Sequence, residues 1–120
     1  MIKYHPAADI QEKMLHVAEK LGMKHDFSRI ICIRSHGSAS RRTIARCYAL
    51  PRVMQVALGI KPHYVIEVIS ERYDRLSEAE KTKVIIHELM HIPKSFGGGF
   101  RYHDHVSRRN VEEMYKRYVR

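Results

Sequence analysis

The chain has 120 residues, which is enough for one domain with an apolar core and too few for two domains of ordinary size. Lysine and arginine outnumber aspartate and glutamate by 22 to 13, so we expect the surface to attract polyanions or acidic partners. No run of about eighteen apolar residues occurs, and the N-terminal segment lacks the apolar stretch of a signal peptide. These features argue against a membrane protein and favour a soluble, cytoplasmic one.

The helix and strands predicted in the first half of the chain follow from apolar spacing. Between Pro6 and Gly22, apolar residues at helical spacing predict an amphipathic helix over residues 6–21. Its inward positions are Ile10, Met14, Val17 and Leu21. A β-branched run bounded by serines and a glycine predicts a strand over residues 29–34, and a second strand is expected over residues 43–49.

The middle of the chain predicts a short helix and a third strand. Pro51 opens a helix over residues 52–58, and Gly59 closes it. A lysine-proline pair then returns the chain to an extended conformation. Residues 64–69, Tyr-Val-Ile-Glu-Val-Ile, form the clearest strand pattern in the sequence.

The last third of the chain predicts two helices joined by a glycine-rich loop. Ser77 is followed three residues later by a glutamate, which is the capping-box pattern and predicts a helix over residues 77–92. Pro93 ends this helix, and the loop occupies residues 95–100. A final helix is predicted over residues 105–118. Its inward positions are Val111, Met114, Tyr115 and Tyr118.

The two cysteines, Cys32 and Cys47, lie far apart in the sequence, each within an apolar stretch. They form neither a CxxC metal half-site nor a disulfide framework. We therefore expect two buried free thiols, with a disulfide between strands as the alternative.

The segment His87-Glu88-Leu89-Met90-His91 is the HExxH pattern of zinc peptidases. On a helix, His87 and His91 stand one turn apart on one face, so their ring nitrogens can bind one ion. Glu88 projects beside that ion, where it can accept a proton from a metal-bound water. The following sequence excludes the metzincin pattern, which requires glycine and histidine at the positions of Lys94 and Gly97.

A catalytic zinc ion needs a third protein ligand and one open position for water. His103 and His105 follow the glycine-rich loop, which can fold the chain back toward the metal. A glutamate of the final helix, Glu112 or Glu113, is a further candidate. The residues alone leave these alternatives open.

The segment from His87 to Pro93, the glycine-rich loop and the run Arg101-Tyr102-His103-Asp104 together resemble the putative phage-type metallopeptidase family, a minimal relative of SprT-like zincins. The resemblance covers roughly residues 64–120. In that family a histidine-aspartate pair follows an HELLH-like segment, which implies His103 as the third ligand. The resemblance also implies a single α+β domain over residues 1–120: a small, mostly antiparallel sheet packed on the HExxH helix, with N- and C-terminal helices.

The predicted function is a zinc metalloprotease with a protein or peptide substrate. One zinc ion held by His87, His91 and His103 lowers the pKa of its bound water toward about 7 and polarises the scissile carbonyl. Glu88 accepts the water proton and passes it to the leaving amine. Zincins hold an extended peptide on an edge strand, and residues 64–69 are the expected strand.

Two further predictions concern the surroundings of the metal. A second oxyanion donor and a carboxylate that orients the ligand histidines are both expected. The candidates are Tyr102, His105 and Arg101 as donors, and Asp104 and Asp74 as carboxylates.

A basic nucleic-acid-associated protein, with an accessory or structural zinc site, is the alternative function. The basic residues available for phosphate contacts are Arg41, Arg42, Arg46, Arg52, Arg108, Arg109, Lys116, Arg117 and Arg120. No nucleic-acid-binding motif accompanies them. SprT-like proteases act on DNA-bound proteins, so the two interpretations are compatible.

Overall fold

A computed structural model describes residues 1–102 and 105–120. In chain order its elements are β1 (Lys3–Pro6), α1 (Ala8–Lys20), the 3-10 turn η1 (Phe27–Arg29), β2 (Ile30–His36), β3 (Ala45–Ala49), α2 (Arg52–Leu58), β4 (Tyr64–Ile69), α3 (Ser70–Tyr73), α4 (Glu78–Met90) and α5 (Arg108–Tyr118). Each helix and strand predicted from the sequence is present, with small differences at its ends. The sequence did not predict β1, η1 and α3, because elements of three or four residues are too short for an apolar pattern to repeat.

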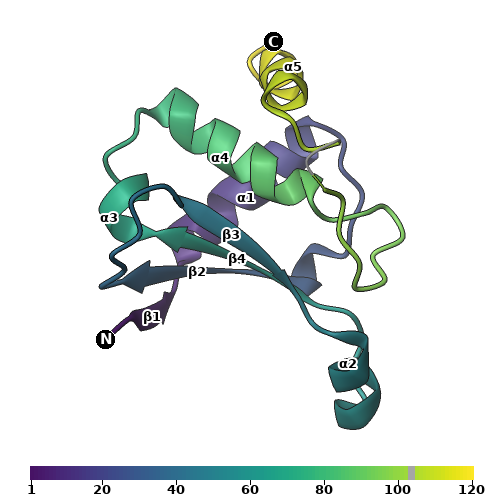
Figure 1. The fold of residues 1–120 in the computed structure, drawn as a ribbon. Coiled ribbons are helices and arrows are strands. Elements are labelled where there is room, and N and C mark those ends of the chain that lie inside the picture. Colours follow the sequence, from purple (N-terminus) through teal and green to yellow (C-terminus); the bar gives the residue numbers. More distant parts are fainter. Residues whose placement is uncertain (103–104) are drawn as a thin grey trace.

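The four strands form one mixed sheet in the order β1-β2-β4-β3. Strand β4 runs parallel to β2, whereas the β1–β2 and β3–β4 pairs are antiparallel. Helices α1 and α4 lie on one face of this sheet (Figure 1). The architecture confirms the predicted α+β class.

Strand β4 is an interior strand, so the prediction that residues 64–69 form the substrate-binding edge was wrong. Its hydrogen-bonding edges are occupied by β2 on one side and β3 on the other. Five of its six residues are buried, which is typical of a strand with a neighbour on each side. The edge strand on this side of the sheet is β3.

The apolar core lies between the sheet and helices α1 and α4. The inward positions predicted for the first helix are all buried, and Val111 of the final helix is buried with Met114, Tyr115 and Tyr118 packed against the core. From α4, the residues Ile85, Ile86 and Leu89 enter this core. They belong to the same buried cluster as Tyr64, Ile66 and Val68, which form the inward face of β4. One apolar side of helix α4 therefore holds it in the core.

The cysteines are both free, as predicted. Cys32 is buried on β2, and the half-buried Cys47 lies on β3. Both residues are aligned with Ile66 of β4, one on each side of it. Two strand spacings separate them, roughly 10 Å, and a disulfide needs Cα atoms closer than about 7 Å. The alternative of a disulfide between strands was therefore wrong.

Helix α2 lies away from this core, beyond the end of the sheet where the chain passes from β3 to β4 (Figure 1). Its apolar residues Val53 and Val56 are 71% and 75% exposed.

No helix within the described ranges 1–102 and 105–120 has the length and apolar content to span a bilayer.

Arg34 on β2 joins two helical segments to the sheet. Its guanidinium donates hydrogen bonds to Asp9 of α1 and to Asp74, which follows α3, each at 2.7 Å. It also lies 3.4 Å from the Ser70 hydroxyl of α3. The hydrogen bond from Arg34 holds the pKa of the Asp9 carboxyl below its ordinary value. The contact therefore links three elements that are distant in sequence.

We expect Arg34→Met to lower the free energy of unfolding by about 2 kcal/mol, because the variant loses two charge-assisted hydrogen bonds from a largely buried side chain. Urea denaturation at neutral pH measures the change. Arg109→Met is the control: Arg109 is 87% exposed and lies 3.7 Å from Glu113 on the same helix. Its loss should cost only about 0.2–0.5 kcal/mol. Equal effects of the two substitutions would contradict the prediction.

Candidate metal centre

Helix α4 carries the HExxH segment and starts at the predicted cap. The Ser77 hydroxyl accepts a hydrogen bond from the amide of Glu80 at 3.2 Å. The helix continues to Met90, and His91 is its C-terminal capping residue. The HExxH segment therefore forms the last turn of a capped helix, as predicted.

His87 and His91 present their ring nitrogens to each other. The two Nε2 atoms are 3.3 Å apart, and the rings meet edge to face. Two nitrogen ligands at about 2.0–2.1 Å from one tetrahedral zinc ion are separated by about 3.3 Å. Together with Glu88, these histidines form a group whose potential ligand atoms lie within 4.8 Å of one another. The donor set and its spacing fit a zinc ion.

The other ring nitrogen of His91 is hydrogen-bonded to the main chain. His91 Nδ1 lies 2.6 Å from the carbonyl oxygen of Arg101, which can only accept, so Nδ1 carries the proton. This tautomer leaves the lone pair of Nε2 directed at the metal position. The prediction that Asp74 orients a ligand histidine was wrong, because that carboxylate binds Arg34.

Hydrogen bonds hold the glycine-rich loop in the conformation that places the Arg101 carbonyl beside His91. The Tyr64 hydroxyl of β4 accepts a hydrogen bond from the amide of Gly98 at 3.0 Å and donates one to the carbonyl of Gly99 at 2.8 Å. Gly98 has a φ of 100°, and a Cβ atom there would lie 2.6 Å from the side-chain nitrogen of Gln55. The amide of Arg101 then donates to the carbonyl of His91 at 2.7 Å. The loop is thus held by the sheet at one end and by α4 at the other.

Glu88 is the buried acid of this group. It is 6% exposed, and burial raises the pKa of its carboxyl to about 7. One carboxylate oxygen lies 3.9 Å from His87 Nε2. A carboxyl that ionises near neutral pH and lies beside a metal position is suited to proton transfer.

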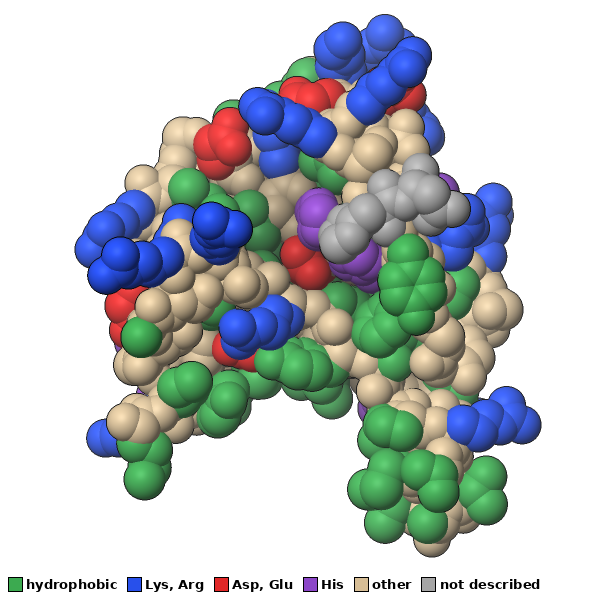
Figure 2. All heavy atoms as spheres, in the orientation of Figure 1, with side chains coloured by type: hydrophobic (Ala, Val, Ile, Leu, Met, Phe, Trp, Pro, Cys, Tyr) green, Lys and Arg blue, Asp and Glu red, His purple; other side chains and the backbone are tan. Residues whose placement is uncertain are grey.

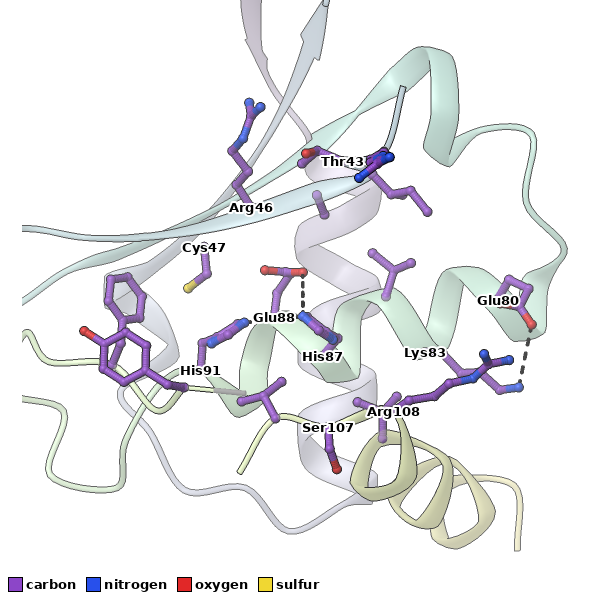
Figure 3. A pocket seen from close by; sticks show the side chains of 18 of the residues that line it. Thr43, Arg46, Cys47, Glu80, Lys83, His87, Glu88, His91, Ser107 and Arg108 are labelled. Atoms are coloured by element: carbon purple, nitrogen blue, oxygen red, sulfur yellow. Dashed lines mark hydrogen bonds and ion pairs between the residues drawn. The ribbon is translucent and has the colours of Figure 1, made fainter. Parts of the chain in front are cut away.

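The three residues open onto a cavity of about 1020 Å³. Strand β3 forms one wall, and residues from α4 and from the start of α5 form the others. In the close view, His87, Glu88 and His91 point into the space beside β3, where Cys47 lies on the wall, while Ser107 and Arg108 approach from α5 (Figure 3). Figure 2 shows histidine and acidic side chains together in the hollowed centre of this face.

The third metal ligand stays a prediction. His103 lies outside the described residues, as does Asp104. His105 is half-buried, and its carbonyl accepts a hydrogen bond from Asn110. Within the described part of the chain, the group that can hold a metal contains His87, Glu88 and His91 and does not include His105.

The remaining site candidates lie around the cavity or away from it. Glu112 lines the cavity with its carboxylate 3.1 Å from Lys83, whereas Glu113 lies 3.7 Å from Arg109. Tyr102 lines the cavity and is 70% exposed. Of the basic residues proposed to contact phosphates, those that line the cavity are Arg42, Arg46 and Arg108. The other basic residues of that set do not line it: Arg41, Arg52, Arg109, Lys116, Arg117 and Arg120.

In the metal-free protein, Glu88→Gln should raise the free energy of unfolding at alkaline pH. The unfolded carboxyl ionises near its ordinary pKa of 4.5, whereas the folded one stays neutral up to about 7. The free energy of unfolding of the wild type therefore falls by about 3 kcal/mol between pH 4.5 and about pH 7. The neutral amide of the variant avoids this loss. The two proteins should have similar stability below pH 4.5 and diverge above it.

Urea denaturation in the presence of a chelator, repeated from about pH 4 to pH 8, measures this difference. Glu78→Gln is the control on the same helix, because Lys13 holds the pKa of the exposed Glu78 carboxyl below its ordinary value. This variant should gain no stability at alkaline pH. A constant offset between Glu88→Gln and the wild type at every pH would contradict the assigned environment of Glu88.

Comparison with protein families gave a match over nearly the whole chain. The family model described as putative phage metallopeptidase matches residues 2–120. Neither the curated proteins nor the solved structures gave a match. The matched region spans the sheet, α4 with its HExxH segment and the elements that line the cavity. The chain therefore belongs to the putative phage metallopeptidase family.

Proposed function

We propose that this protein is a zinc-dependent peptidase in which His87 and His91 hold the metal and Glu88 is the general base. The observation that carries the proposal is the 3.3 Å separation of the two Nε2 atoms beside a buried carboxyl on the same helix. Family membership supports a peptidase. The cavity in front of the group gives a substrate access to it.

Zinc is the metal that this donor set fits best. Two imidazole nitrogens with tetrahedral spacing are typical of zinc sites, whereas magnesium and calcium bind oxygen ligands. Zinc bound there supplies a Lewis acid that activates water and polarises the substrate carbonyl. His103 is proposed as the third ligand, supported by the resemblance of the His103-Asp104 pair to the family motif.

Glu88 moves the proton in this proposal. Its carboxylate takes a proton from the attacking water and passes it to the nitrogen of the leaving amine. In the metal-free site burial raises the pKa of this carboxyl to about 7. The positive charge of a bound ion would favour its ionised form, which is the form that a general base requires. The hydrogen bond between His91 and the Arg101 carbonyl keeps the ligand ring in place while the proton moves.

Strand β3 is the proposed binding edge for an extended peptide. One edge of β3 pairs with β4, and within the described residues no strand pairs with its other edge. Its residues Ala45 to Tyr48 form a wall of the cavity that contains Glu88. A peptide that pairs with β3 through its main chain would therefore pass in front of the metal position.

Glu88→Gln should reduce kcat for an unfolded protein substrate by about 10²–10⁴-fold and retain bound zinc, because the variant lacks the proton acceptor but keeps the ligand histidines. Hydrolysis of fluorescently labelled casein and metal analysis of the same sample measure both properties. Glu78→Gln, the same change on the exposed first turn of α4, should retain activity. Undiminished hydrolysis by Glu88→Gln would refute the assigned role.

His103→Ala should weaken zinc binding by more than roughly a hundredfold, because it removes a direct ligand. Loss of a hydrogen-bond partner of a ligand costs about ten- to a hundredfold. His105→Ala is the matched control, two residues away, and should keep full zinc occupancy. Competition with a chromogenic chelator measures both affinities. Retained zinc in His103→Ala with lost zinc in His105→Ala would assign the ligand to His105 instead.

A further inference from the structure

The segment between β3 and β4 forms an apolar projection, which we call the α2 arm (residues 52–61). Within it, no charged residue occurs from Val53 to Ile60. Five of its large apolar side chains are 42–75% exposed: Val53, Met54, Val56, Leu58 and Ile60. A helix on the surface of a monomer normally has a polar outer face. The α2 arm has the composition of a contact surface.

The open face of the sheet is a second apolar surface. Helices α1 and α4 cover the opposite face, and the α2 arm projects beyond the end of the strands (Figure 1). Tyr4, Ile31 and Tyr48 on this face are 58%, 45% and 43% exposed. The space-filling view shows the apolar lobe of the arm separated by a hollow from the rest of this lower surface (Figure 2).

We propose that these two surfaces bind each other in a symmetric dimer, with the α2 arm of each copy lying against the open sheet face of the other. In a dimer with two-fold symmetry, each contact between two different surfaces occurs twice. The arm of the first copy lies on the sheet of the second, and the arm of the second lies on the sheet of the first. A single chain carries both members of this pair. The occupant of the arm and of the sheet face is therefore a second copy.

The available area is sufficient for a stable dimer. Eight large apolar side chains, five on the arm and three on the sheet, are about half exposed. At roughly 150–200 Å² for each fully exposed side chain, they provide about 600–800 Å² per copy. Two copies would bury about 1,200–1,600 Å², which is the range of specific protein interfaces.

Charge favours association through these surfaces over other parts of the molecule. The chain has a formal net charge of +9, so most faces of two copies repel each other. The arm carries no charge between Val53 and Ile60. On the open sheet face, Arg46 lies 3.9 Å from the buried carboxylate of Glu67, which also accepts hydrogen bonds from Ser35 and Tyr48. Arg52 and Lys61 lie at the two ends of the arm, so the apolar part of the proposed contact carries no charge of its own.

Sedimentation velocity over a hundredfold range of protein concentration tests the dimer. The wild type should have twice the chain mass of 14.1 kDa at the upper concentrations. Val56→Glu on the arm and Ile31→Glu on the sheet should each raise the dissociation constant at least tenfold. Leu15→Glu is the control, because Leu15 is 43% exposed on α1, on the covered side of the sheet. It makes the same change in charge and should remain a dimer.

A wild type that is monomeric at every concentration would overturn the proposal, and so would a Val56→Glu variant that dimerises as the wild type does. Circular dichroism checks that each variant is folded. Val56 is 75% exposed, so its replacement disturbs no core contact. Hydrolysis of casein by Val56→Glu reports separately on the peptidase proposal, because Val56 does not line the metal cavity.

Cysteine crosslinking tests the arrangement within the dimer. The double variant Val56→Cys/Ile31→Cys should form a covalent dimer on mild oxidation, while either single variant should not. The native thiols interfere little, because burial raises the pKa of Cys32 to about 12 and also raises that of Cys47. Crosslinking of Val56→Cys alone would place two arms against each other and overturn the arm-on-sheet contact.

Discussion

The burial of one side of α4 against the sheet determines where its histidines point. Ile85, Ile86 and Leu89 are at most 1% exposed and pack on the covered face of β4. Because a helix turns by about 100° per residue, this contact directs His87 and His91 sideways, toward the wall formed by β3. The metal group therefore depends on an apolar contact made by the residues between and beside the ligands.

Much of this arrangement could be predicted from the sequence. The capping serine, the apolar spacing and the HExxH pattern are local signals, and each predicted the correct element. The interior position of β4 was not predicted, although its near-continuous burial corresponds to a run in which Glu67 is the single polar residue among apolar ones. The partner of His91 could not be predicted, because a main-chain carbonyl such as that of Arg101 has no residue-type signature.

The electrostatics of the site oppose stability. Glu88 is buried, with His87 Nε2 3.9 Å from one of its carboxylate oxygens, and its raised pKa records the unfavourable free energy of ionising it there. A structural helix would be more stable with an apolar residue at this position. The carboxyl is tolerated because the apolar residues of α4 supply the packing that Glu88 does not. Arg34 differs from Glu88, because its charge is matched by those of Asp9 and Asp74.

Tyr64 has a consequence for when the metal site forms. Its ring belongs to the core, and its hydroxyl holds two consecutive residues of the glycine-rich loop, Gly98 and Gly99. Once the sheet has formed, the loop is already directed toward the Arg101 carbonyl and hence toward His91. The loss of conformational entropy needed to orient this ligand thus occurs during folding and not during metal uptake. A small zinc domain that folds around its ion spends binding energy on ordering the chain, whereas in the zinc site proposed here more of that energy would remain available for affinity.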